Sequence, residues 1–215
     1  MPIYFGVGGK AKQISSGFYG VNGKASVIYD SSVVPSGYIP YKYLYATNNA
    51  ASIEINKTFN SFCQIICNFK VIKKNSSGTS YLFKSSNIQV NANAGSLSFN
   101  TIKRDKSYNT TLTSGSEYSL NLTKDLSGNC YLGNTLIFTT ISTFSDNYID
   151  ILQDAYSVFY LSRFYAKNLA TGTELCDLTP CIQVSSNTAG MWDTVSNSFK
   201  TESNSNYRQY LQCSN

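Results

Sequence analysis

The stretch LSGNCYLGNTLIF, residues 126–138, contains two short apolar segments, each preceded by a Gly-Asn pair. Such pairs are typical of tight turns between β-strands, so the stretch predicts consecutive antiparallel strands. Just before it, Ser119-Leu120-Asn121-Leu122 alternates polar and apolar residues. This period of two places one face of a strand in a core and the other in solvent. The region therefore predicts an antiparallel meander with one buried face.

Similar strand candidates, separated by turn residues, continue through most of the chain. With the meander, they are expected at residues 38–45, 51–56, 62–73, 81–84, 88–91, 96–100, 118–123, 129–132, 135–141, 148–152 and 157–167. Ser, Thr and Asn make up 71 of the 215 residues, and only 13% are charged, which favours strands and turns over helices. Many short strands at this spacing predict an all-β fold, an antiparallel β-sandwich or a barrel.

An internal repeat with an offset of 14 occupies the first thirty residues: YFGVGGKAKQI at 4–14 matches FYGVNGKASVI at 18–28. Each unit has a two-residue turn candidate, Gly8-Gly9 or Asn22-Gly23, so we expect two β-hairpins. Units this short cannot bury a core. Residues 1–33 are therefore expected to be an anchor or oligomerisation segment, with packing on the chain's own domain at 34–215 as the alternative. The residues expected to form the contact are Gly6, Val7, Gly9, Lys10, Ala11, Gly20, Val21, Gly23, Lys24 and Ala25.

The cysteines are expected to be reduced, because no export signal precedes them. They are Cys63, Cys67, Cys130, Cys176, Cys181 and Cys213. Cys63 and Cys67 share one face of a predicted strand at a spacing of about 13 Å, too far for a bridge, so both are expected in the core. Cys176 and Cys181 flank Thr179-Pro180, where a bridge or metal clip across a turn stays an alternative.

The chain contains no histidine, which excludes Ser-His-Asp and Cys-His catalysis and His-based metal sites. Glycan hydrolysis uses two carboxylates at a matched separation, but Glu54 has Asn56 rather than an acid two residues on. The acids at positions 146, 150 and 154 are expected to be solvated turn residues rather than a calcium or catalytic site. We therefore expect no enzyme activity, no cofactor and no metal.

The net charge of +5 comes from scattered Lys and few Arg, so nucleic acid is not an expected partner. Lys10, Lys12 and Lys24 make the N-terminus mildly basic. No stretch has the 18 apolar residues of a membrane span, and the N-terminus lacks the order of a signal peptide. Synthesis in the cytoplasm, without a membrane span, is expected.

Two segments resemble a known family. VPSGY at 34–38, leading through YLYAT at 43–47, looks like the opening of concanavalin A-like (laminin-G-like) jelly-roll domains of phage and gut-bacterial surface proteins. The closing stretch resembles the family's last long strand and hairpin, then an Asp-x-x-Pro-Cys turn at 177–181 and a Gly-x-aromatic-Asp-x-Val element at 190–195. The resemblance covers residues 34–200. Trp192 stands where the family more often has Tyr, and residues 201–215 have no place in the pattern.

The GVGGKAK segment at 6–12 is separately similar to short repeats that begin phage structural proteins. The two resemblances imply a bacteriophage virion structural protein on the particle surface: a head-fibre, capsid-decoration or tail-associated component. They imply attachment to other virion proteins through the repeat, and a homo-oligomer, by analogy a trimer. Rival functions are a secreted bacterial adhesin, opposed by the missing signal peptide, and a glycan-degrading enzyme, opposed by the missing carboxylate motif.

The jelly roll implies host-surface or mucosal glycans as ligands, with a purely structural decoration role as the alternative. The sequence does not locate a glycan site. Trp192 is a candidate sugar platform, but its place in the terminal element favours the core. Tyr81, Asn87 and Asn91 are candidates for lining a groove, although nothing distinguishes them from ordinary sheet surface.

Overall fold

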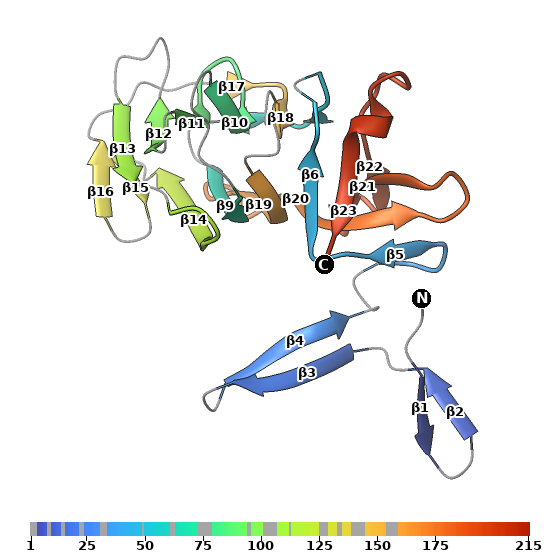
Figure 1. Ribbon diagram of the computed structural model, residues 1–215. Helices are drawn as coiled ribbons and strands as arrows, with labels where there is room; N and C mark the ends of the chain where they lie inside the picture. The colour runs from blue at the N-terminus through green and yellow to red at the C-terminus, as the bar shows by residue number, and fades with distance from the viewer. Residues whose placement is uncertain are drawn as a thin grey trace.

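The computed structural model describes residues 4–7, 10–13, 16–21, 24–30, 34–48, 50–60, 63–72, 79–93, 96–100, 107–111, 113–124, 129–132, 135–138, 145–153 and 159–215. Within them the regular secondary structure is β-strand (Figure 1), apart from the 3-10 turn η2 (Arg208–Tyr210). No helix in these ranges is long and apolar enough to cross a membrane. The strands are β1 (Tyr4–Val7), β2 (Lys10–Gln13), β3 (Ser16–Val21), β4 (Lys24–Asp30), β5 (Tyr38–Pro40), β6 (Tyr43–Ala46), β7 (Ile53–Ile55), β8 (Phe59–Asn60), β9 (Cys63–Val71), β10 (Thr79–Lys84), β11 (Gln89–Asn93), β12 (Ser96–Asn100), β13 (Ser107–Thr111), β14 (Glu117–Lys124), β15 (Cys130–Leu132), β16 (Thr135–Phe138), β17 (Ser145–Asp146), β18 (Ile149–Ile151), β19 (Phe159–Asn168), β20 (Glu174–Gln183), β21 (Thr188–Asp193), β22 (Ser198–Lys200) and β23 (Leu211–Ser214).

Two large antiparallel sheets make up the body of the protein. The larger sheet runs in the order β16-β15-β14-β9-β19-β20-β21-β22, with β5 beside β20 and with β6 joining β19 to β23. The smaller runs in the order β13-β12-β11-β10-β18-β7. Consecutive strands pair in the predicted meander, Leu122 with Leu132 and Tyr131 with Leu136. This arrangement confirms the predicted all-β fold, an antiparallel β-sandwich consistent with a jelly roll.

The core lies between the facing sides of the two sheets. Strand β9 shows the reason most clearly, because its residues alternate buried and half-buried along the whole strand, with Cys63, Ile65, Cys67, Phe69 and Val71 inward. The smaller sheet contributes Ile53, Ile55, Leu82, Phe83, Val90, Ile149 and Ile151 to the same cluster. Phe83 meets Phe164 of β19 edge to face, with ring centroids 5.7 Å apart. The sheets therefore pack through interdigitated apolar side chains, as sandwiches do.

The turn predicted at the Asp-x-x-Pro-Cys segment is wrong. Residues Glu174–Gln183 form the single long strand β20. One edge of β20 pairs with β19 up to Leu178 and with β5 from Cys181 onward. Pro180 lies between these two partners, so its missing N–H falls where the pairing changes, and its carbonyl accepts a hydrogen bond from Tyr41 N at 2.9 Å.

The structure also tests the cysteine predictions. Cys63 and Cys67 are buried, unbridged core thiols, as expected. Cys176 and Cys181 are also free, and because they lie on one extended strand, roughly 17 Å of backbone separates them and no turn brings them together. The thiol of Cys130 lies outside the side chains that the structure describes.

The polar tail at residues 201–215 is part of the sandwich. Strand β23 pairs with β6 in the register Leu211 with Ala46 and Cys213 with Leu44. Leu211 is buried in the core. Glu202, also buried, accepts a hydrogen bond from Ser52 N at 2.8 Å, which fixes the start of the tail to the segment before β7. The tail thus closes one end of the larger sheet.

Candidate functional site

The repeat forms two hairpins with the same register. In β1–β2, Gly6 pairs with Ala11 and Val7 with Lys10. In β3–β4, Gly20 pairs with Ala25 and Val21 with Lys24. Gly9 and Gly23, predicted at the two turns, lie outside the described residues, and side-chain contacts of the other repeat residues are likewise outside the description. Each hairpin is a sheet of its own. The described strands thus show no ladder between the repeat and the sandwich.

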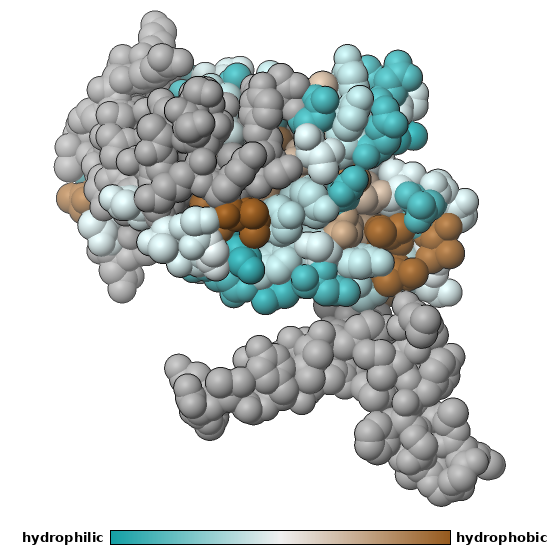
Figure 2. All heavy atoms as spheres, viewed as in Figure 1, coloured by the Kyte–Doolittle hydropathy of each residue, from teal (hydrophilic) through white to brown (hydrophobic). Residues whose placement is uncertain are grey.

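A groove with a volume of about 530 Å³ lies at the opposite end of the chain, between the β20–β21 hairpin and the η2–β23 tail. Its lining combines buried apolar residues with exposed amide and hydroxyl side chains. The lining residues are Ile182, Ser186, Asn187, Thr188, Ala189, Arg208, Gln209, Leu211, Gln212 and Cys213. Figure 2 shows hydrophilic residues gathered over the tail and a hydrophobic patch over β5, beside the β20–β21 hairpin. Val184, in the turn of that hairpin, is exposed.

The hairpin wall of the groove is held by short polar contacts. Ser186 Oγ donates to Gln183 Oε1 at 2.8 Å, and Gln183 Nε2 donates to the Tyr38 hydroxyl at 3.3 Å. Asn187 has a φ of 51°, in the left-handed region that asparagine tolerates better than most residues with a side chain. The turn therefore presents hydroxyl and amide groups at the lip of the groove.

The tail wall is organised around Arg208. Its Nε donates to the carbonyl of Glu202 at 2.7 Å and its Nη2 to the carbonyl of Ser203 at 3.4 Å. Among the described residues, no carboxylate lies within ion-pair distance of this guanidinium. Burial raises the pKa of the Cys213 thiol to about 12, so that lining residue is neutral at physiological pH. Arg208 is therefore the one charged residue in the lining.

A group of tyrosines, Tyr43, Tyr45 and Tyr160, adjoins β23 on the outer face of the larger sheet; we call it the tyrosine shelf. The rings of Tyr45 and Tyr160 stack at 4.2 Å with an interplanar angle of 9°. The Tyr45 hydroxyl donates to Gln212 Oε1 at 2.8 Å, which links the shelf to a groove residue. Stacked, half-exposed rings beside amides offer the apolar faces and hydrogen-bonding groups that sugars need.

The shelf ends in a charged contact. Glu117 accepts hydrogen bonds from Lys42 Nζ and from the Tyr43 hydroxyl. These two donors, Lys42 foremost, lower the pKa of the Glu117 carboxyl. Tyr43 is only 4% exposed, so the contact holds the first ring of the shelf in place while the other two remain accessible.

Trp192 does not lie in the core. It is half-buried on β21, where its ring is 4.9 Å from that of Tyr38, and Tyr38 in turn is 5.3 Å from Phe199. The expected core position is therefore wrong. Side chains alternate between the two faces of β21, so Met191 points into the core and its neighbour Trp192 points outward. Tyr38 thus packs against both Trp192 and Phe199, and the three rings form a cluster on the outer face of the sheet.

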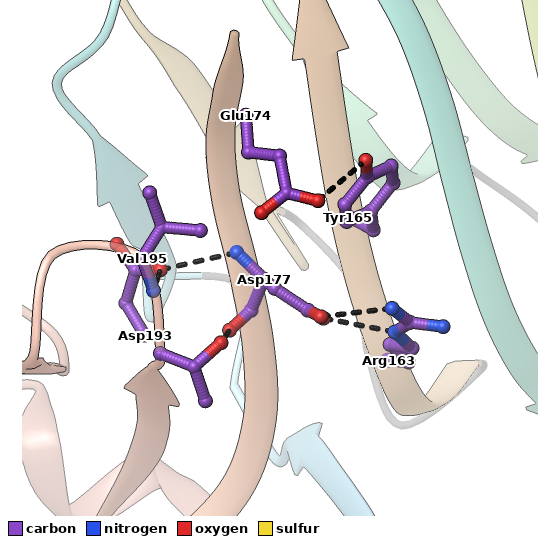
Figure 3. Close-up of polar contacts among 7 residues, drawn as sticks. Arg163, Tyr165, Glu174, Asp177, Asp193 and Val195 are labelled. Atoms are coloured by element: carbon purple, nitrogen blue, oxygen red, sulfur yellow. Dashed lines mark hydrogen bonds and ion pairs between the residues drawn. The ribbon is translucent and has the colours of Figure 1, made fainter.

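The closing motifs meet in a structural network rather than a binding site. Figure 3 shows Arg163 and Asp177 facing each other from β19 and β20, joined by two hydrogen bonds of 2.8 Å. Asp193 on β21 accepts hydrogen bonds from the backbone N–H groups of Asp177 and Val195. The carboxylates of both motifs are thus engaged in joining strands and the turn after β21.

A carboxylate pair that the sequence spacing did not reveal lies on the smaller sheet. Glu54 of β7 stands directly opposite Asp150 of β18, and Lys84 of β10 stands opposite Asp150 on its other side. Burial, followed by the negative charge of Glu54, raises the pKa of Asp150 to about 6. The partners come from different strands, so the comparison of Glu54 with Asn56 could not have found them.

The remaining sequence candidates do not converge on one site. Asn87 Nδ2 donates to Asp146 Oδ1 at 2.5 Å, and Asn91 is almost fully buried. Tyr81 lies under Lys84, whose Nζ is 4.6 Å from the ring centroid. Asp146 is buried rather than solvated, and hydrogen bonds from Ser85 and Asn87 satisfy its carboxylate. Asp154 lies outside the described residues.

The described side chains include no group of three or more His, Cys, Asp or Glu residues arranged to hold a metal ion. No protein-family model matches the chain, and a search of curated proteins also finds no match.

Proposed function

We propose that this chain is a structural protein of a bacteriophage virion that attaches through its hairpin repeat and displays the β-sandwich, with host-surface or mucosal glycans as its ligands. The observation that carries the proposal is the repeat itself. Two hairpins have the same Gly–Ala and Val–Lys register, and neither pairs with a strand of the sandwich in the part of the chain that the structure describes. Isolated two-stranded hairpins are marginally stable in water, so they require a partner surface.

The sandwich supplies the displayed part of this proposal. Its groove combines a mainly polar lining of hydroxyl and amide side chains with a smaller apolar part at its base, a composition suited to the mixed polar and apolar surface of a sugar. Several copies on one particle would multiply a weak affinity, so a homotrimer fits the same role. Light scattering of the purified chain measures this state directly.

The attachment proposal is tested on purified particles. We expect mass spectrometry to find the chain in the virion and an antibody against the sandwich to label intact particles. A variant lacking residues 1–30 should fold but fail to join the particles. Absence of the full chain from particles contradicts the virion role, whereas incorporation of the shortened variant contradicts only the anchor.

Glycan hydrolysis is a second candidate function, favoured by the Glu54–Asp150 pair. Directly opposed residues on neighbouring strands have Cβ atoms about 4.5–5.5 Å apart. The two side chains therefore lie side by side on one face of the sheet, and retaining glycosidases also use two neighbouring carboxyl groups. The raised pKa of Asp150 would suit a proton donor. Release of reducing sugar that disappears in Asp150→Asn supports this candidate, and no release by the native chain excludes it for the glycans tested.

A further inference from the structure

We propose that the groove between the β20–β21 hairpin and the η2–β23 tail binds an acidic saccharide, with the guanidinium of Arg208 receiving the carboxylate or sulfate of the sugar. This inference rests on the proposed glycan-binding function and adds the site and the chemical class of the ligand. It does not depend on whether the repeat attaches the chain to a virion.

The lining of the groove has apolar residues at its base and polar residues at its lips, and a sugar can contact both kinds. Its floor includes the buried side chains of Ala189 and Leu211, while Ser186, Asn187 and Gln209 are exposed at its lips. The exposed amides and hydroxyls, which make up most of the accessible lining, can pair with the hydroxyl groups of a sugar, and the smaller apolar part at the base can contact its C–H groups. A volume of about 530 Å³ fits a short saccharide rather than a protein segment with its own fold.

The charge of the groove selects the kind of saccharide. Arg208 is the sole charged residue of the lining, and no acid among the lining residues offsets it. The contrast with Arg163 is informative, since that guanidinium is already satisfied by a bidentate contact with Asp177. Arg208 is held instead by two backbone carbonyls, which fix its position without neutralising it.

This arrangement leaves donor capacity for a ligand. A guanidinium has five N–H groups, and the two recorded hydrogen bonds of Arg208 use one on Nε and one on Nη2. The remaining N–H groups can form a charge-assisted contact with a carboxylate or sulfate. Because the guanidinium is already positioned, little side-chain freedom is lost when the anion binds.

The test compares ligands that share one neutral core. Lactose, sialyllactose and sulfated lactose are titrated into the full chain and followed by NMR, with the methyl ester of sialyllactose as a neutral analogue of the same shape. We expect sialyllactose or sulfated lactose to bind at least about tenfold more tightly than lactose, and esterification to remove the advantage of the carboxylate. The stronger of the two acidic ligands identifies whether carboxylate or sulfate is the group received.

A matched pair of variants locates the site. Arg208→Gln removes the groove cation, whereas Lys167→Gln removes the same charge near the opposite end of β20, where Lys167 pairs with Glu174. We expect the acidic sugar to lose about tenfold or more in affinity in Arg208→Gln and to be unaffected in Lys167→Gln. Arg208→Lys keeps the charge and tests the need for the forked guanidinium. Circular dichroism of each variant confirms folding.

The possible failures are distinguishable. Equal binding of sialyllactose and its ester, without preference for sulfated lactose, overturns the acidic-saccharide inference using the native chain alone. Acidic-sugar binding that persists in a folded Arg208→Gln variant places the site elsewhere and leaves glycan binding intact. No binding to any saccharide of a broad glycan array contradicts the glycan-binding part of the proposed function, while the particle-attachment test remains a separate result.

Discussion

Asp193 shows how one buried carboxylate fixes the end of the larger sheet. The residue has no exposed surface, and it accepts hydrogen bonds from the N–H groups of Asp177 and Val195 and from the Ser196 hydroxyl at 2.5 Å. A buried polar group that keeps all its partners stabilises a structure, but its removal leaves those partners unsatisfied. Asp193 therefore holds both β20 and the turn after β21 in place.

We expect Asp193→Ala to lower the free energy of unfolding by about 3 kcal/mol, because a fully buried side chain is removed and two backbone donors and one hydroxyl, all partly buried, lose their acceptor. Urea unfolding monitored by the fluorescence of Trp192, the only tryptophan, measures the change. Asp177→Asn is the control and should lose about 1 kcal/mol or less, since its contact with Arg163 is partly solvated. Equal losses in the two variants would contradict the role assigned to Asp193.

Asp150, in contrast to Asp193, lowers the stability of the fold when its carboxyl group is ionised. Its pKa is raised from 3.8 to about 6 by burial and by Glu54, so the folded protein holds a proton that the unfolded chain has released between about pH 4 and 6. Stability from this residue is therefore lost as pH rises through that window. The side chain is half-buried, and after solvent screening we expect an effect of about 1 kcal/mol.

The corresponding prediction is that Asp150→Asn is more stable than the native chain at pH 7.5, by about 1 kcal/mol, and equally stable near pH 4. Unfolding in urea at several pH values measures the difference. Glu54→Gln should reproduce part of the gain, because it removes the like charge opposite Asp150. A gain that is the same at every pH would show that titration of Asp150 is not its cause.

At the scale of elements, strands were predictable wherever the local pattern had a period of two. The range 62–73 became β9 because its apolar residues alternate, and 96–100 became β12. Strand β20 was missed because Pro180 signals a turn locally, while its tolerance depends on a change of partner strand that only the tertiary structure supplies. The tail was missed because β23 is short and pairs with β6, far away in the sequence.

Gly190 illustrates a contact between elements that demands one residue type. A Cβ at this position would lie 2.3 Å from the carbonyl oxygen of Lys200 and 2.7 Å from the ring of Phe199. The bare glycine therefore leaves room for the Lys200 carbonyl beside β21, and it lets the Phe199 ring reach the outer cluster with Tyr38.

We expect Gly190→Ala to destabilise the fold by about 2 kcal/mol, because β22 must move away from β21. Thermal unfolding followed by circular dichroism gives the change. Adding Phe199→Ala to this variant removes the ring contact but leaves the Lys200 carbonyl in place, so recovery should be partial. Full recovery would mean that the backbone contact is unimportant.

At the scale of the whole molecule, the candidate site was harder to predict than the fold. The groove is made by residues 182–189 and 208–213, whose side chains show no common pattern in the sequence. The Glu54–Asp150 pair likewise joins β7 to β18 across a long separation. Local periodicity specifies which residues face the core, but the meeting of distant strands depends on topology, which sequence spacing does not reveal.

The separation between repeat and sandwich gives a last prediction. The sandwich core is formed by residues 44–211, and the described strands of the repeat pair only with each other. Removal of residues 1–33 should therefore leave the midpoint of thermal unfolding within about 2 °C of the full chain, a shift that corresponds to less than about 1 kcal/mol for a domain of this size. Differential scanning calorimetry of both proteins at equal concentration makes the comparison, and light scattering of both tests whether the proposed homo-oligomer depends on the hairpins. A fall of 10 °C or more would show that the hairpins pack on the chain's own sandwich, because only a shared core couples the two so strongly.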